Sequence, residues 1–304
     1  TPIGQMNLTN LLKNTGFDVS TQKTINRDFQ ERFKKMGFLT ATNEGWRCVP
    51  NVANYLVHQA MLKPWFNKLA QTIVMEREPT YPPKAIYQHQ FRKLRLFLYQ
   101  GNETGFEANI AQIYSNSNAY FEEAMMDLFF ANLDKNWFLS LPKKIRFAVL
   151  KFTIWSDYLS FDPDSITNKY KLNRLLEESF GDVRPESDEI AHFVLEERLF
   201  RGIDKDAKTW LANDNSAKGL QLKALLAVFE NRYDDSLELF AEALKLIRKG
   251  NKRNATFGSF YDFIYALMLF RTRTLVNLQA MDAYLLVCLK KHSDPMLILL
   301  HDAL

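Results

Sequence analysis

The sequence predicts a mainly α-helical protein, in which a small N-terminal module with a β-hairpin precedes an irregular array of helices. Apolar residues recur at helical spacing along most of the 304 residues. Strand signals are confined to residues 38–49. Prolines gather at 79–83, where they restrict the backbone and exclude a helix. We therefore expect two parts, residues 1–78 and 79–304.

The N-terminal module is expected to begin with a short amphipathic helix over residues 6–15, which Gly16 ends. A second helix follows, and Ser20 or Thr21 can cap it because their hydroxyls accept from the free amides of a first turn. One apolar stripe runs along this helix at helical spacing, through Ile25, Phe29, Phe33 and Met36. Gly37 is placed to end the helix.

A β-hairpin is predicted directly after this second helix. Aromatic and β-branched residues occupy 38–42 and 46–49, around a turn at Asn43-Glu44-Gly45. Pro50 closes the hairpin because proline lacks a backbone donor. A helix that runs into a hairpin is the order of recognition helix and wing in a winged-helix module.

The polar face of the second helix is the candidate functional surface of the chain. Arginine and lysine neutralise phosphates, and asparagine, glutamine or arginine can pair with base edges. The candidate nucleic-acid-binding residues are Lys23, Asn26, Arg27, Gln30, Lys34 and, on the wing, Arg47. The alternative is a module that contacts only protein, with these charges as a solvated face. Asp28 and Glu31 on the same helix favour this alternative.

The charge distribution sets the first residues apart from the rest. Residues 1–63 contain eight Lys and Arg against four Asp and Glu, a net charge of +4. The whole chain has 39 against 35, so residues 64–304 are balanced at 31 against 31. This asymmetry is expected if one module touches a polyanion such as double-stranded DNA, here through residues 20–50.

The composition indicates a cytoplasmic protein with a real core. Hydrophobic residues make up 47% of the chain, and no apolar run approaches the roughly 20 residues that a membrane span needs. The two cysteines, Cys48 and Cys288, are far apart and are predicted to be free thiols. No CxxC or paired-histidine spacing predicts a metal site.

No catalytic site is predicted in these residues. The chain has no GxxxxGK[ST] or GxGxxG phosphate loop, no GxSxG and no HExxH, and its adjacent glutamates are explained by solvated helix faces. No cofactor is expected.

The array after the proline-rich linker is predicted to contain a series of helices. Their expected ranges are 84–100, 103–115, 118–133, 144–160, 165–180 and 186–201. A compact turn with a buried Trp137 is expected at residues 137–142, and two long, largely buried helices at 256–304.

A helical hairpin at residues 217–250 is the most specific pattern of the array. Small and aromatic residues stand where two helices and their neighbours would meet: Ala224, Ala227, Tyr233, Ser236, Phe240 and Ala243. This run resembles a tetratricopeptide repeat, with Ser236 where alanine is usual and Lys223-Ala224 where Leu-Gly is usual. The neighbouring segments match only in length, so an irregular array is expected. It would hold a protein partner or the rest of its own chain.

A winged-helix-like start, a proline linker and helices with a Trp-x-x-x-Leu-Pro turn together resemble the N-terminal region of bacterial Swi/Snf-type ATP-dependent DNA translocases. The resemblance implies a non-catalytic region that targets or regulates an ATPase. Both ends look like the ends of a fragment, so we expect that ATPase beyond residue 304. The array also resembles helical repeats of large bacterial transcription activators. A scaffold for protein partners and a sensing region of a transcription regulator therefore stay open as alternatives.

Overall fold

The structure is a computed structural model of the chain, and it is mainly α-helical, as predicted. It describes residues 18–42, 45–75, 78–80, 83–116, 135–158, 163–249, 254–272, 274–291 and 294–303. The chain divides into two compact units, Thr1–Ser179 and Phe180–Leu304. The proposed boundary between residues 78 and 79 falls inside the first unit. The helices predicted over residues 6–15 and 118–133 lie outside the described residues.

Helix α2, Val19–Asp28, begins at an acidic cap. One carboxylate oxygen of Asp18 accepts from the Thr21 amide at 2.9 Å, and the other accepts from the Thr21 hydroxyl at 2.5 Å. The predicted cap at Ser20 or Thr21 was therefore wrong by two or three residues, because Asp18 accepts with both oxygens while Thr21 is already inside the helix. These hydrogen bonds lower the pKa of Asp18.

The helix continues through one turn of π-helix, η1, Phe29–Phe33, and ends at Gly37. Gly37 has a φ of +70°, and its amide donates to Lys34 O while the Phe38 amide donates to Phe33 O, both at 3.1 Å. This is a Schellman ending, completed by contact between the rings of Phe33 and Phe38, whose centres lie 6.4 Å apart. Met36 lies in this turn and is 59% exposed, so the predicted apolar stripe does not extend to it.

The predicted hairpin is present as strands β1, Leu39–Thr42, and β2, Gly45–Cys48. The strands are antiparallel and pair Leu39 with Cys48 and Thr42 with Gly45. Gly45 therefore opens β2, and the connection has two residues where the sequence predicted a three-residue turn. Two-residue connections fit the natural twist of a hairpin.

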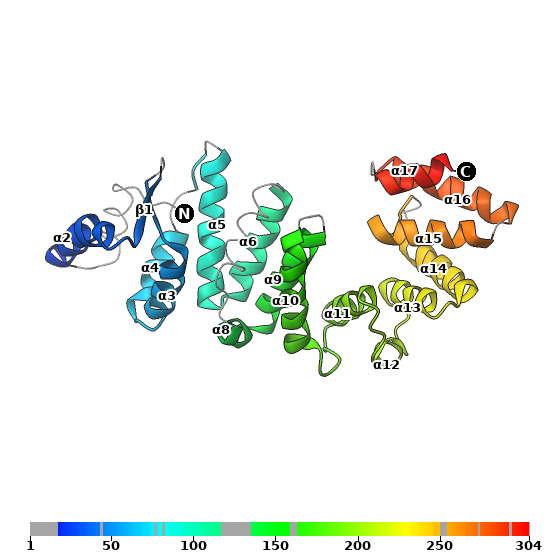
Figure 1. The fold of residues 1–304 in the computed structure, drawn as a ribbon, viewed down its shortest axis with the longest axis horizontal. Helices are drawn as coiled ribbons and strands as arrows, with labels where there is room; N and C mark the ends of the chain where they lie inside the picture. The colour runs from blue at the N-terminus through cyan, green and yellow to red at the C-terminus, as the bar shows by residue number, and fades with distance from the viewer. Residues whose placement is uncertain are drawn as a thin grey trace. The chain divides into compact units, whose positions relative to one another are not determined.

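Helices α3 to α10 complete the first unit (Figure 1). Their bounds are Pro50–Met61 (α3), Trp65–Val74 (α4), Pro83–Gln100 (α5), Glu103–Asn116 (α6), Lys135–Ser140 (α8), Lys143–Tyr158 (α9) and Pro163–Phe180 (α10). Helix α5 packs on α4 and α6, and α6 packs on α9. The segment predicted as a turn with a buried Trp137 is the short helix α8, in which Phe138 is the buried residue and Trp137 is half-buried against Tyr99.

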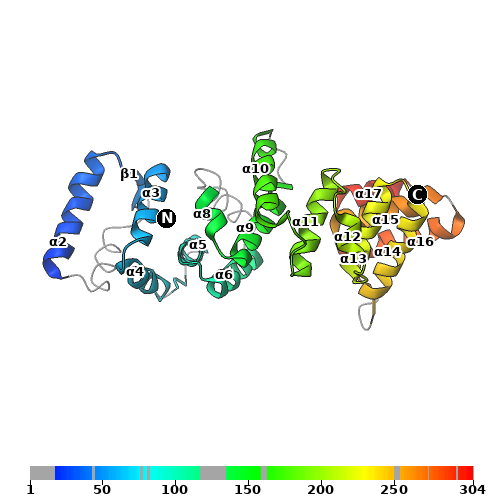
Figure 2. The same cartoon turned by 90° about the horizontal axis from the view of Figure 1, so that it is seen from below.

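The second unit consists of helices that pack mainly on their neighbours in the sequence, and α13 to α16 lie side by side in both Figure 1 and Figure 2. Their bounds are Asp188–Phe200 (α11), Ala207–Leu211 (α12), Ala217–Phe229 (α13), Tyr233–Ile247 (α14), Ser259–Thr272 (α15), Leu275–Leu289 (α16) and Pro295–Asp302 (α17). Three helices therefore occupy residues 256–304, where two were predicted. Thr274 and Asp294 start the second and third of these helices, since each side chain caps the helix that follows it.

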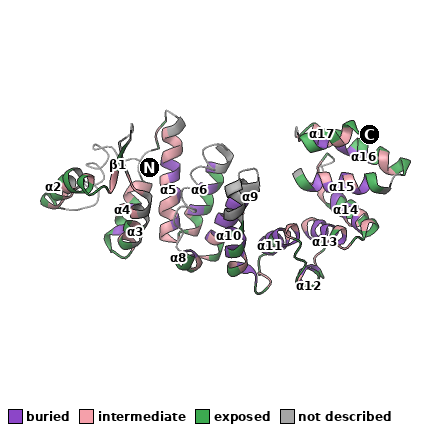
Figure 3. Cartoon of the chain, viewed as in Figure 1, coloured by how far each residue is buried: buried purple, intermediate pink, exposed green. Residues whose placement is uncertain are grey.

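Helices α13 and α14 of the second unit form a helical hairpin and pack extensively on each other. Of the six residues expected at its contact, Tyr233 is only half-buried, and five are fully buried: Ala224, Ala227, Ser236, Phe240 and Ala243. Figure 3 shows buried residues along both α13 and α14. Small side chains let the two backbones approach, and Phe240 fills the space toward α15, where it contacts Tyr261 and Tyr265.

Two further findings concern properties predicted from composition. Cys48 and Cys288 are both free thiols. None of the helices in the described ranges is long and apolar enough to cross a membrane.

Candidate nucleic-acid interface

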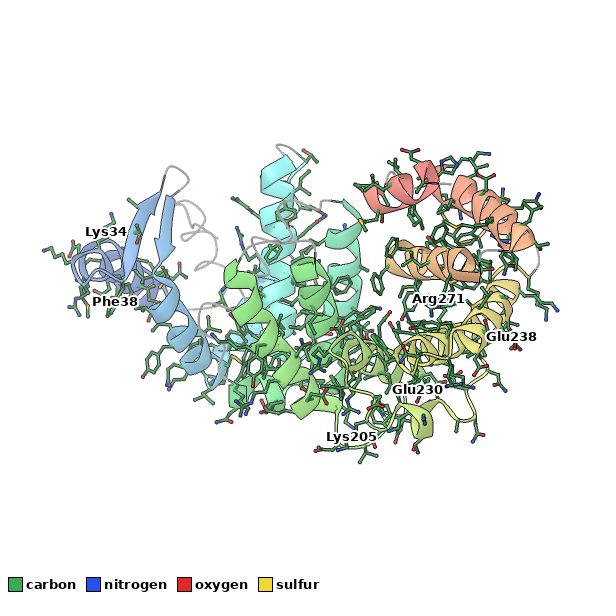
Figure 4. The ribbon with its side chains drawn as sticks, turned by 45° about the vertical axis from the view of Figure 1, so that its right-hand side comes forward. Lys34, Phe38, Lys205, Glu230, Glu238 and Arg271 are labelled. Carbon is green, nitrogen blue, oxygen red and sulfur yellow. The ribbon has the colours of Figure 1, made fainter. Side chains whose placement is uncertain are left out.

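The structure describes the side chains of three of the six candidate residues. Lys23 and Arg27 are exposed on α2, and Lys34 is half-buried at the end of the same helix. The side chains of Asn26, Gln30 and Arg47 lie outside the described residues. Lys34 and Phe38 mark the place where the helix runs into the hairpin (Figure 4).

The π turn changes which side chains continue the face that Lys23 and Arg27 begin. A π turn closes with an i to i+5 hydrogen bond and holds one more residue than an α-turn. Side chains after it are therefore rotated by one residue, roughly 100° about the helix axis. In a regular α-helix the residues one turn beyond Arg27 would be Gln30 and Glu31, whereas with an i to i+5 turn Arg32 takes that place. Arg32 is 69% exposed and lies inside the π turn.

Asp28 lies between the two arginines of this face. Its carboxylate is 3.7 Å from the Nε of Arg27 and 3.3 Å from the Nε of Arg32. One carboxylate is shared by two guanidinium groups, and the exposed Glu31 in the π turn balances the second of these charges. Exposed pairs of this kind contribute little to stability, so both arginines can exchange Asp28 for a phosphate at small cost.

Sequence reasoning missed Arg32 as a candidate because it assumed regular α-helical spacing. The sequence RDFQERF carries no signal that would predict a π turn within it. Lys35, which is also exposed, was omitted for the same reason.

The hairpin presents a polar edge next to this helix end. Thr40 is paired with Arg47 across the two strands, and both Thr40 and Ala41 are exposed. Small exposed residues on β1 leave room for a phosphate backbone to approach this strand.

Positive charge extends past the hairpin into the helices that follow. Residues 1–100 contain 14 Lys and Arg against 6 Asp and Glu, a net charge of +8, whereas residues 101–304 contain 25 against 29. Helix α5 contains Arg92, Lys93 and Arg95 and no acidic residue. A polyanion that approaches α2 would therefore meet further positive potential along the first 100 residues.

One group in the second unit combines the residue types of a hydrolytic triad. His192 Nε2 lies 2.5 Å from the Asp214 carboxylate, and the Ser216 amide donates to the same carboxylate at 2.9 Å. The Ser216 hydroxyl, however, accepts from the Gly219 amide at 3.0 Å and caps α13. A nucleophilic serine needs a base in hydrogen-bond contact, and His192 faces the aspartate instead. This group therefore has the geometry of a structural pair.

No set of three or more His, Cys, Asp or Glu side chains in the described ranges is arranged to hold a metal ion. The chain matches no protein-family model, and neither a curated protein nor a solved structure matches it.

Proposed function

We propose that this chain is a non-catalytic region that contacts nucleic acid through α2, the π turn and the hairpin, and contacts protein through the helices of its second unit. The supporting observation is the row of exposed cations Lys23, Arg27 and Arg32 on a helix that runs directly into a β-hairpin. Helix followed by hairpin is the winged-helix order, in which the helix enters a groove and the wing lies on the backbone.

The most specific context for this activity is the one that the sequence resemblance implies. There, the chain belongs to a larger bacterial Swi/Snf-type DNA translocase and brings an ATPase to DNA. The contact is mainly with phosphates, because three cations on one helix face attract the phosphate backbone whatever its base sequence.

A triple variant tests this proposal. Replacing Lys23, Arg27 and Arg32 with glutamine removes three charges from the face. Each phosphate contact contributes about −0.9 to the slope of log K against log salt, so the slope should become about 2.7 units less steep. The affinity for a fluorescein-labelled random duplex at low salt should fall strongly. Anisotropy titrations at several salt concentrations measure both quantities.

The matched control removes the same charge from the second unit. Lys205, Lys245 and Lys249 are exposed and form no ion pair with any described residue. Replacing these three with glutamine should leave affinity and slope within about twofold of the unmodified chain. Equal losses in both triple variants would mean that binding follows net charge and not the helix face.

A helical-repeat scaffold for protein partners is the second candidate function. It is favoured by the α13–α14 hairpin, whose buried Ala224, Ala227, Ser236, Phe240 and Ala243 stand at tetratricopeptide-like positions. Stacked hairpins of this kind present long surfaces that grip peptides. A stoichiometric protein partner, together with no DNA binding at low salt, would select the scaffold. A sensing region would instead be selected by a small molecule that raises the melting temperature.

A further inference from the structure

The second unit contains a half-open pocket where the turn between α13 and α14 faces the end of α15. Its volume is about 380 Å³, within the range of small-ligand sites. The walls come from Asn231 to Asp235 on one side and from Met268 and Arg271 on the other. Figure 4 labels Arg271 on α15 and Glu230 at the turn. The pocket lies wholly within the second unit.

Arg271 is held in this pocket by an aromatic ring. Its guanidinium carbon lies 3.7 Å from the ring centre of Tyr233, the first residue of α14. The Tyr233 hydroxyl donates to the side-chain oxygen of Asn231 at 2.6 Å, which fixes the ring. Asn231 has a φ of +60° and turns the chain between the two helices. A guanidinium group that stacks on a fixed ring keeps its in-plane N–H donors pointed outward.

The other arginine of the pocket is already neutralised. Arg232 donates to the Glu230 carboxylate at 2.9 and 2.6 Å and to Asp235 at 2.5 Å. Lys208 also pairs with Glu230, at 2.6 Å. These pairs raise the pKa of Arg232 and lower that of Glu230.

Arg271, in contrast, is in ion-pair contact with none of the carboxylates that the structure describes. Asp234 also lines the pocket, and among the described residues it has neither a hydrogen-bond donor nor a cationic partner. The pocket thus offers one fixed cationic donor group and one free acceptor beside an apolar wall at Met268.

We propose that this pocket binds a carboxylate group of a peptide, with Arg271 as the group that recognises it. One free guanidinium matches one negative charge in a bidentate pair. A dianionic phosphate is disfavoured because Arg271 supplies a single unpaired positive charge and Asp234 lines the same pocket. A peptide also brings N–H donors next to its carboxylate, and these suit Asp234. The site does not depend on nucleic-acid contact at α2.

The proposal can be tested with three small probes on the full chain labelled at its methionine methyl groups with ¹³C. The probes are N-acetyl-glycyl-leucine, the C-terminal amide of the same dipeptide, and N-acetyl-glutamic acid N-methylamide. The methyl signal of Met268, assigned through a Met268→Leu variant, reports on the pocket wall. We expect the free dipeptide acid to shift it with a Kd of about 1 mM, the range for a ligand of this size. The amide should bind at least about tenfold more weakly.

Variants assign the binding to Arg271. Arg271→Gln should weaken the binding of the dipeptide acid about tenfold. Arg271→Lys keeps the charge and loses the planar stack, so its Kd should lie between those of the unmodified chain and Arg271→Gln. Lys245→Gln removes a charge from α14 away from the pocket and should change nothing. Unchanged melting temperatures show that each variant is folded.

Two sources of the carboxylate are separated by the probes. Binding of the dipeptide acid would identify the carboxylate as that of a peptide C-terminus. Binding of the glutamate derivative alone would identify it as that of an acidic side chain. Either result supports recognition by Arg271. Equal binding of acid and amide, equal binding by Arg271→Gln and the unmodified chain, or no shift with any probe would overturn the proposal.

Discussion

His192 and Asp214 form a close pair between the start of α11 and the loop before α13, with His192 Nε2 2.5 Å from the Asp214 carboxylate. Their side chains are only 11% and 12% exposed. Burial raises the pKa of Asp214, but hydrogen bonds from His192 and Ser216 outweigh burial and lower the pKa to about 2. The pair therefore ties α11 to the loop before α13 through a carboxylate that stays charged.

This pair predicts an acid-dependent stability. An unfolded aspartate has a pKa of roughly 4, above the folded value of about 2. Its contribution to stability is therefore complete above about pH 4 and is lost as the pH falls toward 2. We expect Asp214→Asn to be less stable than the unmodified chain by about 2 kcal/mol at pH 7, and this difference to shrink between pH 4 and 2. Urea denaturation followed by circular dichroism measures it. A difference that stays constant over this range would rule out the pair as its source.

Gly219 is expected to resist substitution because it lies against the fixed Asp214 carboxylate. A Cβ at this position would lie 2.3 Å from the Asp214 carboxyl carbon, which His192 and Ser216 hold in place. Glycine to alanine normally stabilises a helix by up to about 1 kcal/mol. Gly219→Ala should instead destabilise the chain by about 1–2 kcal/mol, because the carboxylate must move and lose its partners. A higher melting temperature for this variant would contradict the geometry.

A second buried carboxylate predicts a larger effect. Asp262 is fully buried and accepts from the amides of Phe257 and Gly258, at 2.8 and 3.1 Å, and from the Tyr284 hydroxyl at 2.5 Å. Asp262→Asn places an amide group among these donors and should cost about 2–3 kcal/mol. Tyr284→Phe removes one hydrogen bond and should cost about 1 kcal/mol. Chemical denaturation gives both values, and the reverse order would show that the amide contacts contribute little.

The two thiols should differ in reactivity. Cys288 is fully buried, and burial raises its pKa to about 12, whereas Cys48 is half-buried with a pKa that burial also raises. Thiolate is the reactive form. At pH 8, a disulfide reagent should therefore label Cys48 first and Cys288 only on unfolding, and a Cys48→Ser variant should show no early phase. Equal rates for the two cysteines would contradict the burial of Cys288.

Much of the fold could be predicted from local sequence. The helix end at Gly37 and the hairpin after it follow from a glycine and from an alternation of residue types that act within a few positions. The close packing of α13 on α14 was predictable from small residues such as Ala224 and Ala243, which only a helix pair explains. The cap at Asp18 could also have been predicted, since aspartate is among the preferred capping residues.

The remaining features arise from distant or irregular contacts. Tyr233 and Arg271 are 38 positions apart in the sequence, and only the packing of α14 on α15 brings them together. Tyr284 reaches Asp262 across 22 residues in the same way. The π turn brings Arg32 onto the proposed binding face one turn beyond Arg27, and a rule based on regular helical spacing cannot foresee that change.

Binding of the unmodified chain to a labelled random-sequence duplex, followed by anisotropy at about 50 and 200 mM salt, tests the proposed nucleic-acid contact most directly. A row of three phosphate contacts predicts clear binding at the lower salt and a loss of about 40-fold at the higher. Absence of binding at 50 mM, or binding that salt does not weaken, would contradict the proposal and leave the module as a protein contact.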